Sequence, residues 1–109
     1  TIYGDGEQTR DFLFVDDCVD ALVRAGARGD GLLINVGTGV ETSVNDLYAH
    51  LAASLGVEGP PEVAAARPGE VQRSVLDPAR AAMQLGWSSW TSLADGTART
   101  LEWLRTRDG

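Results

Sequence analysis

Short apolar runs that alternate with segments of helical spacing constrain the fold of this chain most. The two clearest runs are Phe12–Val15 and Leu32–Val36, and shorter extended segments are expected at Thr1–Tyr3 and Glu62–Ala66. A run without polar alternation is typical of a strand that is covered on both faces. Strands that alternate with helices favour an α/β fold with some parallel pairing. We therefore expect a small mixed sheet with about four helices.

The first helix is expected to begin directly after the first apolar run. Asp16 is predicted to cap it, Asp17 to complement its dipole, and Gly26 to end it after about Ala25. The inward-facing stripe is predicted to consist of Cys18, Val19, Leu22 and Ala25. Acid–base catalysis is an alternative role for the adjacent Asp16 and Asp17, but capping is the commoner role at a helix start.

Three further helices are expected over residues 43–56, 77–86 and 92–107. A serine followed three residues later by aspartate opens the first and the third, in the manner of a capping box. Asp-Pro opens the second, and glycine ends the first two. The three tryptophans are expected to pack around the last helical pair: Trp87, Trp90 and Trp103.

The charge composition limits the partners of the chain. Its 109 residues carry a net charge of −7, which argues against nucleic acid because that binding needs a basic surface. No apolar run approaches a membrane span, and a single cysteine excludes an internal disulfide, so we expect a cytoplasmic protein. All nine positive residues are arginine. Any anion must therefore be held by arginine and backbone amides.

Two arginines are the candidate anion ligands. Arg10 lies between a glycine-rich turn at residues 4–6 and the first apolar run. Arg67 begins the sequence RPGE, which also makes a turn after a short extended segment. The planar guanidinium fork can donate two parallel hydrogen bonds to a phosphate or carboxylate. If the two side chains converge, they form an anion clamp.

Other motifs offer weaker candidates for chemistry. The segment Gly37-Thr38-Gly39 imitates the opening of a dinucleotide loop, but Thr42 stands where a third glycine belongs. A tight strand-to-helix turn is therefore the expected role. The only histidine, His50, is predicted to lie on a solvated helix face, so no Ser/His/Asp triad is expected. No set of metal ligands is visible in the sequence.

Four segments, in order and over nearly the whole chain, resemble the C-terminal part of extended short-chain dehydrogenase/reductases. They are IYGDGEQTRDFLFVDDCVDA (2–21), INVGTGVETSVNDL (34–47), RPGEVQRSVLDPARAAMQLGW (67–87) and TSLADGTARTLEWLR (91–105). This is the family of NAD-dependent epimerases and dehydratases of sugar nucleotides. Within it, the segments look most like UDP-glucose 4-epimerase and its relatives.

The resemblance implies a role for four residues in binding a UDP-sugar. Arg10 and Arg67 would bind the diphosphate, Glu70 would hydrogen-bond the ribose, and Tyr3 would lie along the base. The family often has aspartate at the position of Glu70. Its glycine-rich NAD loop and catalytic tyrosine–lysine pair would lie upstream. No catalytic or cofactor-binding residue is therefore expected in this chain, and the complete enzyme is expected to be a homodimer.

The resemblance thus predicts the substrate-binding, C-terminal portion (residues 1–109) of an NAD-dependent nucleotide-sugar 4-epimerase. An alternative within the family is a nucleotide-sugar 4,6-dehydratase or a reductase, because the residues that discriminate these activities would lie upstream. An alternative from another class is a non-catalytic module that binds nucleotide-sugars or other anions.

Overall fold

The computed structural model describes residues 1–28 and 31–108, and within these it contains four helices. The helices are α1 (Val15–Arg28), α2 (Val44–Leu55), α3 (Ala79–Leu85) and α4 (Leu93–Asp108). The strands are β1 (Ile2–Tyr3), β2 (Thr9–Arg10), β3 (Thr42–Ser43) and β4 (Val63–Ala64). β1 pairs with β4 in parallel, and β2 pairs with β3 antiparallel. The predicted α/β class is confirmed, with two small ladders of opposite kind.

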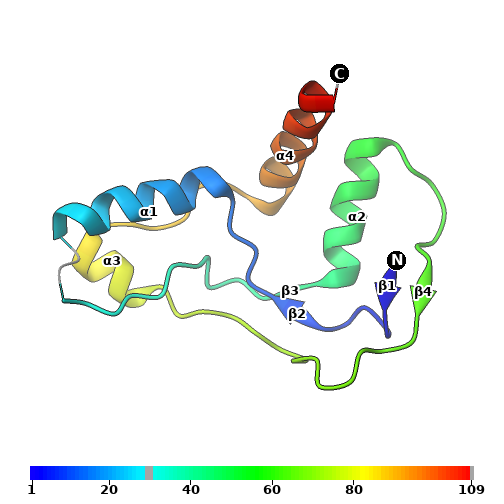
Figure 1. Cartoon of the computed structure of the whole chain (residues 1–109), viewed down its shortest axis with the longest axis horizontal. Helices are drawn as coiled ribbons and strands as arrows, with labels where there is room; N and C mark the ends of the chain where they lie inside the picture. Colours follow the sequence, from blue (N-terminus) through cyan, green and yellow to red (C-terminus); the bar gives the residue numbers. More distant parts are fainter. Residues whose placement is uncertain (29–30, 109) are drawn as a thin grey trace.

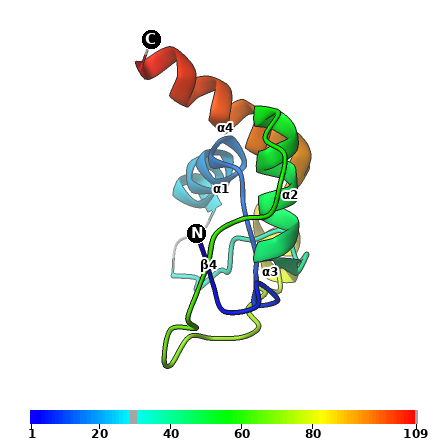
Figure 2. The same cartoon turned by 90° about the vertical axis from the view of Figure 1, so that its right-hand side faces the viewer.

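The helices form two pairs that extended segments connect. α1 packs on α3, and α2 packs on α4. In Figure 1 the α1–α3 pair lies on the left, and the α2–α4 pair lies to its right, with β1 and β4 at the far edge. Figure 2 shows the molecule from its edge. The overall dimensions are 46 × 37 × 19 Å, so the molecule is flat.

This flat shape leaves an unusually large surface exposed. The radius of gyration is 16.1 Å, whereas a compact domain of this length has about 13 Å. The accessible surface is 7364 Å², whereas a compact monomer of this mass exposes about 5,800 Å². The chain therefore buries less of its own surface than a self-contained domain of equal length.

The small core lies between α1 and α3. Its fully buried hydrophobic members are Ala21, Ala81, Leu85 and Trp87. Partly buried side chains from the two apolar runs pack against this cluster, among them Leu13, Ile34 and Val36.

A buried carboxylate anchors α1 beside this core. Asp17 is fully buried and accepts hydrogen bonds from Trp90 N (3.0 Å), Thr91 N (2.9 Å) and Thr91 Oγ1 (2.6 Å). Its backbone carbonyl accepts a further bond from Trp87 Nε1 (2.9 Å). Burial raises the pKa of Asp17, but the hydrogen bonds from Thr91 and Trp90 lower it more, so the pKa lies below its ordinary value of 3.8. The ionised carboxylate thus fixes α1 to the segment that precedes α4.

The two longest predicted strands are wrong. Residues 12–14 are not part of a ladder, and Val15 already belongs to α1. Leu32–Val36 is likewise not a strand, and the side chain of Leu33 is 84% exposed. A strand is defined by hydrogen bonds to a neighbour, and within residues 1–28 and 31–108 no strand pairs with either run. The shorter segments β1 and β4 do pair with each other, which confirms that they are extended.

The boundaries of α1 also differ from the prediction. The helix begins at Val15, so Asp16 lies within its first turn, and the Asp16 carboxylate pairs with Arg99 of α4 (2.9 Å). Gly26 does not end the helix, which continues to Arg28. A glycine inside a helix costs only about 1 kcal/mol, which neighbouring packing can outweigh.

The predicted inward face of α1 is confirmed only in part, because Ala25 packs against the core but Val19 and Leu22 do not. Val19 and Leu22 are 50% and 65% exposed, and Cys18 is half-buried. The buried residues of α1 are Asp17 and Ala21. Apolar periodicity cannot identify this face, because a carboxylate with several donors can be buried in place of an apolar side chain. The larger apolar side chains of the stripe, Val19 and Leu22, therefore remain on the surface.

The prediction that all three tryptophans are packed inside is confirmed for one of them only. Trp87 is buried in the core, as predicted. Trp90 and Trp103 are 58% and 57% exposed, so their predicted packing around the last helical pair is wrong.

The local signals for the other helices are confirmed. Ser43 Oγ accepts from Asp46 N, and Ser92 Oγ accepts from Asp95 N, both at 3.1 Å. Glycines in the left-handed conformation end α2 and α3, with φ values of 69° and 62°. Asp77 Oδ1 accepts from Ala79 N (3.0 Å) at the start of α3. These elements depend on neighbours in sequence, which explains why a pattern predicts them.

Replacing Asp17 with Asn in the complete protein should lower the free energy of unfolding by about 1–3 kcal/mol at neutral pH, because buried donors lose their ionised acceptor. Since the folded-state pKa of Asp17 is depressed, its stabilisation is present above about pH 4 and is lost as the pH falls through the folded pKa. Thermal unfolding at pH 7 and pH 3 should therefore show a smaller difference between wild type and variant at pH 3.

The control is Asp16→Asn, which removes the neighbouring carboxylate in the same turn of α1. The side chain of Asp16 is 53% exposed. Its cost should not exceed about 1 kcal/mol, as for other exposed ion pairs. Equal losses in the two variants would contradict the anchoring role of Asp17.

Candidate functional site

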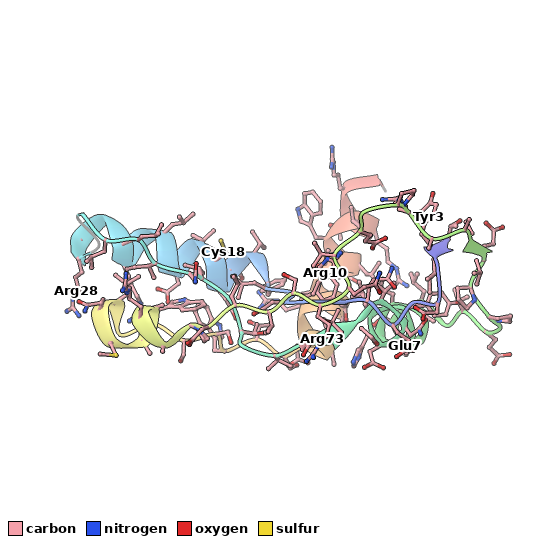
Figure 3. All side chains as sticks on the ribbon, turned by 90° about the horizontal axis from the view of Figure 1, so that it is seen from below. Tyr3, Glu7, Arg10, Cys18, Arg28 and Arg73 are labelled. Atoms are coloured by element: carbon pink, nitrogen blue, oxygen red, sulfur yellow. The ribbon has the colours of Figure 1, made fainter. Side chains whose placement is uncertain are left out.

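The side chain of Arg10, the last residue of β2, is held by a carbonyl group of β2 and by one from the segment that follows Glu70. Its NH1 group donates to Thr9 O (2.6 Å) and to Val71 O (2.7 Å). Its NH2 group lies 3.5 Å from Glu70 Oε1. The side chain is 32% exposed, so it is fixed by the protein while part of it faces solvent. Figure 3 shows Arg10 near the middle of the molecule.

Arg67 lies against the aromatic ring of Tyr3. The Cζ atom of Arg67 is 3.9 Å from the ring centroid, which is the geometry of a cation–π contact. The parallel pairing of Tyr3 with Ala64 brings the two residues together, since Arg67 follows β4 by three positions.

A buried amide connects these two arrangements. Gln8 is only 6% exposed, and its Nε2 donates to Tyr3 O (3.1 Å) and to Glu70 Oε1 (3.2 Å). Arg67, Tyr3, Gln8, Glu70 and Arg10 thus form one continuous chain of contacts. The structure therefore brings the four predicted site residues into one cluster.

Gln8 was not predicted as part of this cluster. Nothing in its residue type separates it from the polar residues beside it in the sequence. A usable signal was its spacing from Arg10, because residues two apart in an extended segment point to the same side.

The turn before Arg10 is as tight as predicted. Gly4 and Gly6 have φ values of 82° and 75°, which glycine adopts most easily. A Cβ atom on Gly6 would overlap the side chain of Asn45. Asn45 Nδ2 itself donates to Asp5 O (3.0 Å) and to Glu7 Oε1 (2.7 Å). The start of α2 thus supports the turn that leads to Arg10.

The glycine segment at residues 37–39 surrounds a carboxylate of the chain itself. Asp11 accepts from Thr38 N, Thr38 Oγ1 and Gly39 N at 2.7–3.0 Å, and from Leu76 N at 3.3 Å. Burial raises the pKa of Asp11, but the hydrogen bonds from Thr38, Gly39 and Leu76 lower it below 3.8. A Cβ atom on Gly37 would lie 2.7 Å from Asp11 Oδ2. These amides are engaged by Asp11, which favours the structural turn over a dinucleotide loop.

An ion pair with one largely exposed partner, Arg73, flanks the cluster. Glu41 binds Arg73 through two hydrogen bonds, of 2.6 Å to Nε and 2.8 Å to NH2, and it also accepts from Thr9 Oγ1 (2.6 Å). The hydrogen bonds from Arg73 and Thr9 lower the pKa of Glu41 to about 2. This pair was not predicted, because its members lie 32 residues apart in the sequence.

Two structural properties bear on other classes of function. Over residues 1–28 and 31–108, no helix combines the length and apolar character needed to cross a membrane. In the same part of the chain, no group of histidine, cysteine, aspartate and glutamate side chains could hold a metal ion.

Known proteins similar to this chain are enzymes of sugar-nucleotide metabolism. The family model described as GDP-mannose 4,6 dehydratase matches residues 1–100. A UDP-glucose 4-epimerase of Mycolicibacterium smegmatis is 49% identical over 107 residues, which is 97% of this chain and 34% of the relative.

Solved structures agree with this similarity. A UDP-glucose 4-epimerase of Thermotoga maritima with UDP-glucose superposes with a TM-score of 0.94 at 39% identity, covering 99% of this chain and 35% of that one. A UDP-glucuronic acid 4-epimerase of Bacillus cereus in complex with UDP-glucuronic acid and NAD has a TM-score of 0.88 at 30% identity, covering 97% and 35%. The chain therefore spans about a third of the length of these relatives.

Gly6→Ala in the complete protein should destabilise the turn for two reasons. A left-handed alanine costs about 1–2 kcal/mol, and the new methyl group must displace Asn45 from its two acceptors. We expect a total loss of about 2–4 kcal/mol in the free energy of unfolding, measured by denaturant titration.

Gly56→Ala separates these two causes. Gly56 has a similar φ of 69°, but among residues 1–28 and 31–108 no atom lies within 4 Å of the position that the methyl group of an alanine would take. It should therefore show only the conformational cost of about 1–2 kcal/mol. If both variants lose the same stability, the close approach of Asn45 has no energetic importance.

Proposed function

The chain belongs to the NAD-dependent epimerase/dehydratase family of extended short-chain dehydrogenase/reductases, and on this basis we propose that it holds the nucleotide diphosphate of a UDP-sugar within a nucleotide-sugar 4-epimerase. The observation that carries the proposal is the continuous cluster of Arg67, Tyr3, Gln8, Glu70 and Arg10. It combines two cations, an aromatic ring and a carboxylate, which are complementary to a diphosphate, a base and a ribose.

In this proposal the two arginines bind the diphosphate. A guanidinium has five N–H donors, and Arg10 uses NH1 for both of its carbonyl contacts. Its Nε and one NH2 hydrogen are then available to a phosphate oxygen. Arg67 can donate to the second phosphate from its place against Tyr3. A charge-assisted hydrogen bond contributes about 1.5–3 kcal/mol. Two such residues can therefore hold a diphosphate although the chain has a net charge of −7.

The carboxylate and the aromatic ring take the nucleoside in the same proposal. Glu70 is 24% exposed, and Gln8 and Arg10 both contact its Oε1. In this proposal its other oxygen, Oε2, accepts from a ribose hydroxyl. Tyr3 is 38% exposed, which leaves part of the side chain free to lie along the base.

These residues would contribute to the reaction by binding and orientation. Contacts to the non-reacting nucleotide can position the sugar for chemistry elsewhere in the enzyme. Relatives of known structure contain NAD, whose nicotinamide accepts and returns a hydride. The glycine segment beside Asp11 does not fit a dinucleotide, since its amides already bind that carboxylate. We therefore assign NAD binding and the catalytic groups to the remainder of the enzyme.

The exposed apolar surface fits this assignment. Val15, Val19, Leu22 and Val23 of α1 are at least half exposed, and so is Leu33 of the second apolar run. The relatives contain about twice as much additional sequence as this chain supplies. We propose that the NAD-binding part of the enzyme covers this surface, including the apolar run 32–36.

A 4,6-dehydratase is a second candidate activity. The matching family model carries that description, and a dTDP-glucose 4,6-dehydratase of Streptomyces antibioticus is 38% identical over 107 residues. A diphosphate site serves both reactions equally. Identification of the product from UDP-glucose distinguishes them, since epimerisation keeps the sugar's 6-hydroxyl and dehydration removes it.

Arg10→Ala and Arg67→Ala in the complete protein should each weaken UDP binding by about 10- to 100-fold, through loss of a charge-assisted hydrogen bond. Affinity for NAD should remain nearly unchanged. Calorimetric titration with UDP and with NAD measures both quantities.

The matched control is Arg105→Ala on the exposed side of α4, which should leave both affinities unchanged. Unaltered UDP affinity in both site variants would refute the diphosphate assignment.

Residues 1–109 expressed alone should self-associate or unfold without a cooperative transition, because the apolar surface of α1 and Leu33 would face water. Sedimentation and thermal unfolding measure these properties. A monomer with a sharp transition would show that the chain needs no covering partner.

A further inference from the structure

The carboxylate of Glu41 joins the two segments that hold Arg10. From β2, Thr9 Oγ1 donates to Glu41 Oε1 (2.6 Å). From the segment after Glu70, Arg73 donates to both oxygens of Glu41 (2.6 and 2.8 Å). The same two segments are also joined directly, since Thr9 N donates to Gln72 O (2.8 Å).

The position of Arg10 depends on the relative placement of these segments. Its NH1 group binds one carbonyl from each, Thr9 O at 2.6 Å and Val71 O at 2.7 Å. Val71 is two residues from Arg73, and Thr9 is the immediate neighbour of Arg10. A change in the distance between the segments must therefore break one of the two bonds to the guanidinium. Figure 3 shows Arg10 and Arg73 in this central region.

We propose that Glu41 and Arg73 are positioning residues for Arg10, which set the guanidinium in the orientation that receives a phosphate. This inference rests on the proposed diphosphate-binding function of Arg10. Glu41 and Arg73 act through the backbone of Thr9 and Val71 and need no contact with the ligand. They add two residues to the site that neither charge pattern nor turn chemistry indicates.

The exposure of the pair separates this role from a role in stability. The side chain of Arg73 is 79% exposed, and that of Glu41 is 25% exposed. Exposed ion pairs contribute little to the free energy of unfolding. Loss of the pair should therefore leave the fold intact while the guanidinium of Arg10 becomes mobile. The low pKa of Glu41 keeps its carboxylate ionised over the whole range in which binding is measured.

The test uses UDP binding to the complete protein, measured by calorimetry. Glu41→Gln and Arg73→Gln should each weaken UDP binding by roughly threefold to tenfold, less than Arg10→Ala, with unchanged NAD affinity and thermal midpoint. Arg73→Lys keeps the charge but lacks the planar fork, so its effect should be intermediate. In an Arg10→Ala background, Glu41→Gln should have no further effect, because it acts only through Arg10.

Asp20→Asn is the matched control, since it removes another exposed two-bond ion pair, with Arg24 on α1. It should leave UDP affinity unchanged. Wild-type affinity in Glu41→Gln and Arg73→Gln, or a full additional loss in the Arg10→Ala background, would overturn the positioning role. If Arg10→Ala itself binds UDP normally, the assignment of Arg10 to the diphosphate fails instead. Should Glu41→Gln not fold, Arg73→Gln and Arg73→Lys decide the question alone.

Discussion

Two partly or fully buried carboxylates hold this chain together where a large hydrophobic core would otherwise do so. Asp11 accepts hydrogen bonds from residues 38, 39 and 76, and Asp17 accepts from residues 90 and 91. A buried carboxylate is costly unless its donors are complete. Here the donors are mostly backbone amides of segments that form no regular ladder. The carboxylates thus supply these amides with acceptors and fix the path of the extended segments at the same time.

The arrangement explains how a flat molecule can present an ordered site. The Asp11 contacts fix the segments that lead away from Arg10 and toward α3, while Gln8 and Glu41 act on either side of that arginine. The guanidinium is therefore held by polar contacts from several segments. Its surroundings remain open to solvent, which suits a residue that must receive a charged ligand.

The sequence predicted those features that depend on near neighbours. Ser43 and Ser92 cap their helices as expected, because the acceptor and the donor lie three residues apart. Leu32–Val36 failed as a strand, because apolar composition gives no information about whether a pairing partner lies alongside. The burial of Asp17 was missed, because its donors lie 73 and 74 residues away. Arg10 and Arg67 were predicted from the charge composition and the glycine-containing turns, and Tyr3 and Glu70 were added by the family resemblance. Gln8, Glu41 and Arg73 were missed, because their contacts join segments that are distant in the sequence.

The distance along the chain between Asp17 and Thr91 also affects how the protein is made. Translation proceeds from the N-terminus, so α1 leaves the ribosome long before the hydroxyl and amide that bind its carboxylate have been synthesised. Until then the carboxylate must stay hydrated, and the helix cannot dock in its final place. Docking of α1 is therefore expected to wait until residue 91 has left the ribosome, and contacts of such long sequence separation close slowly.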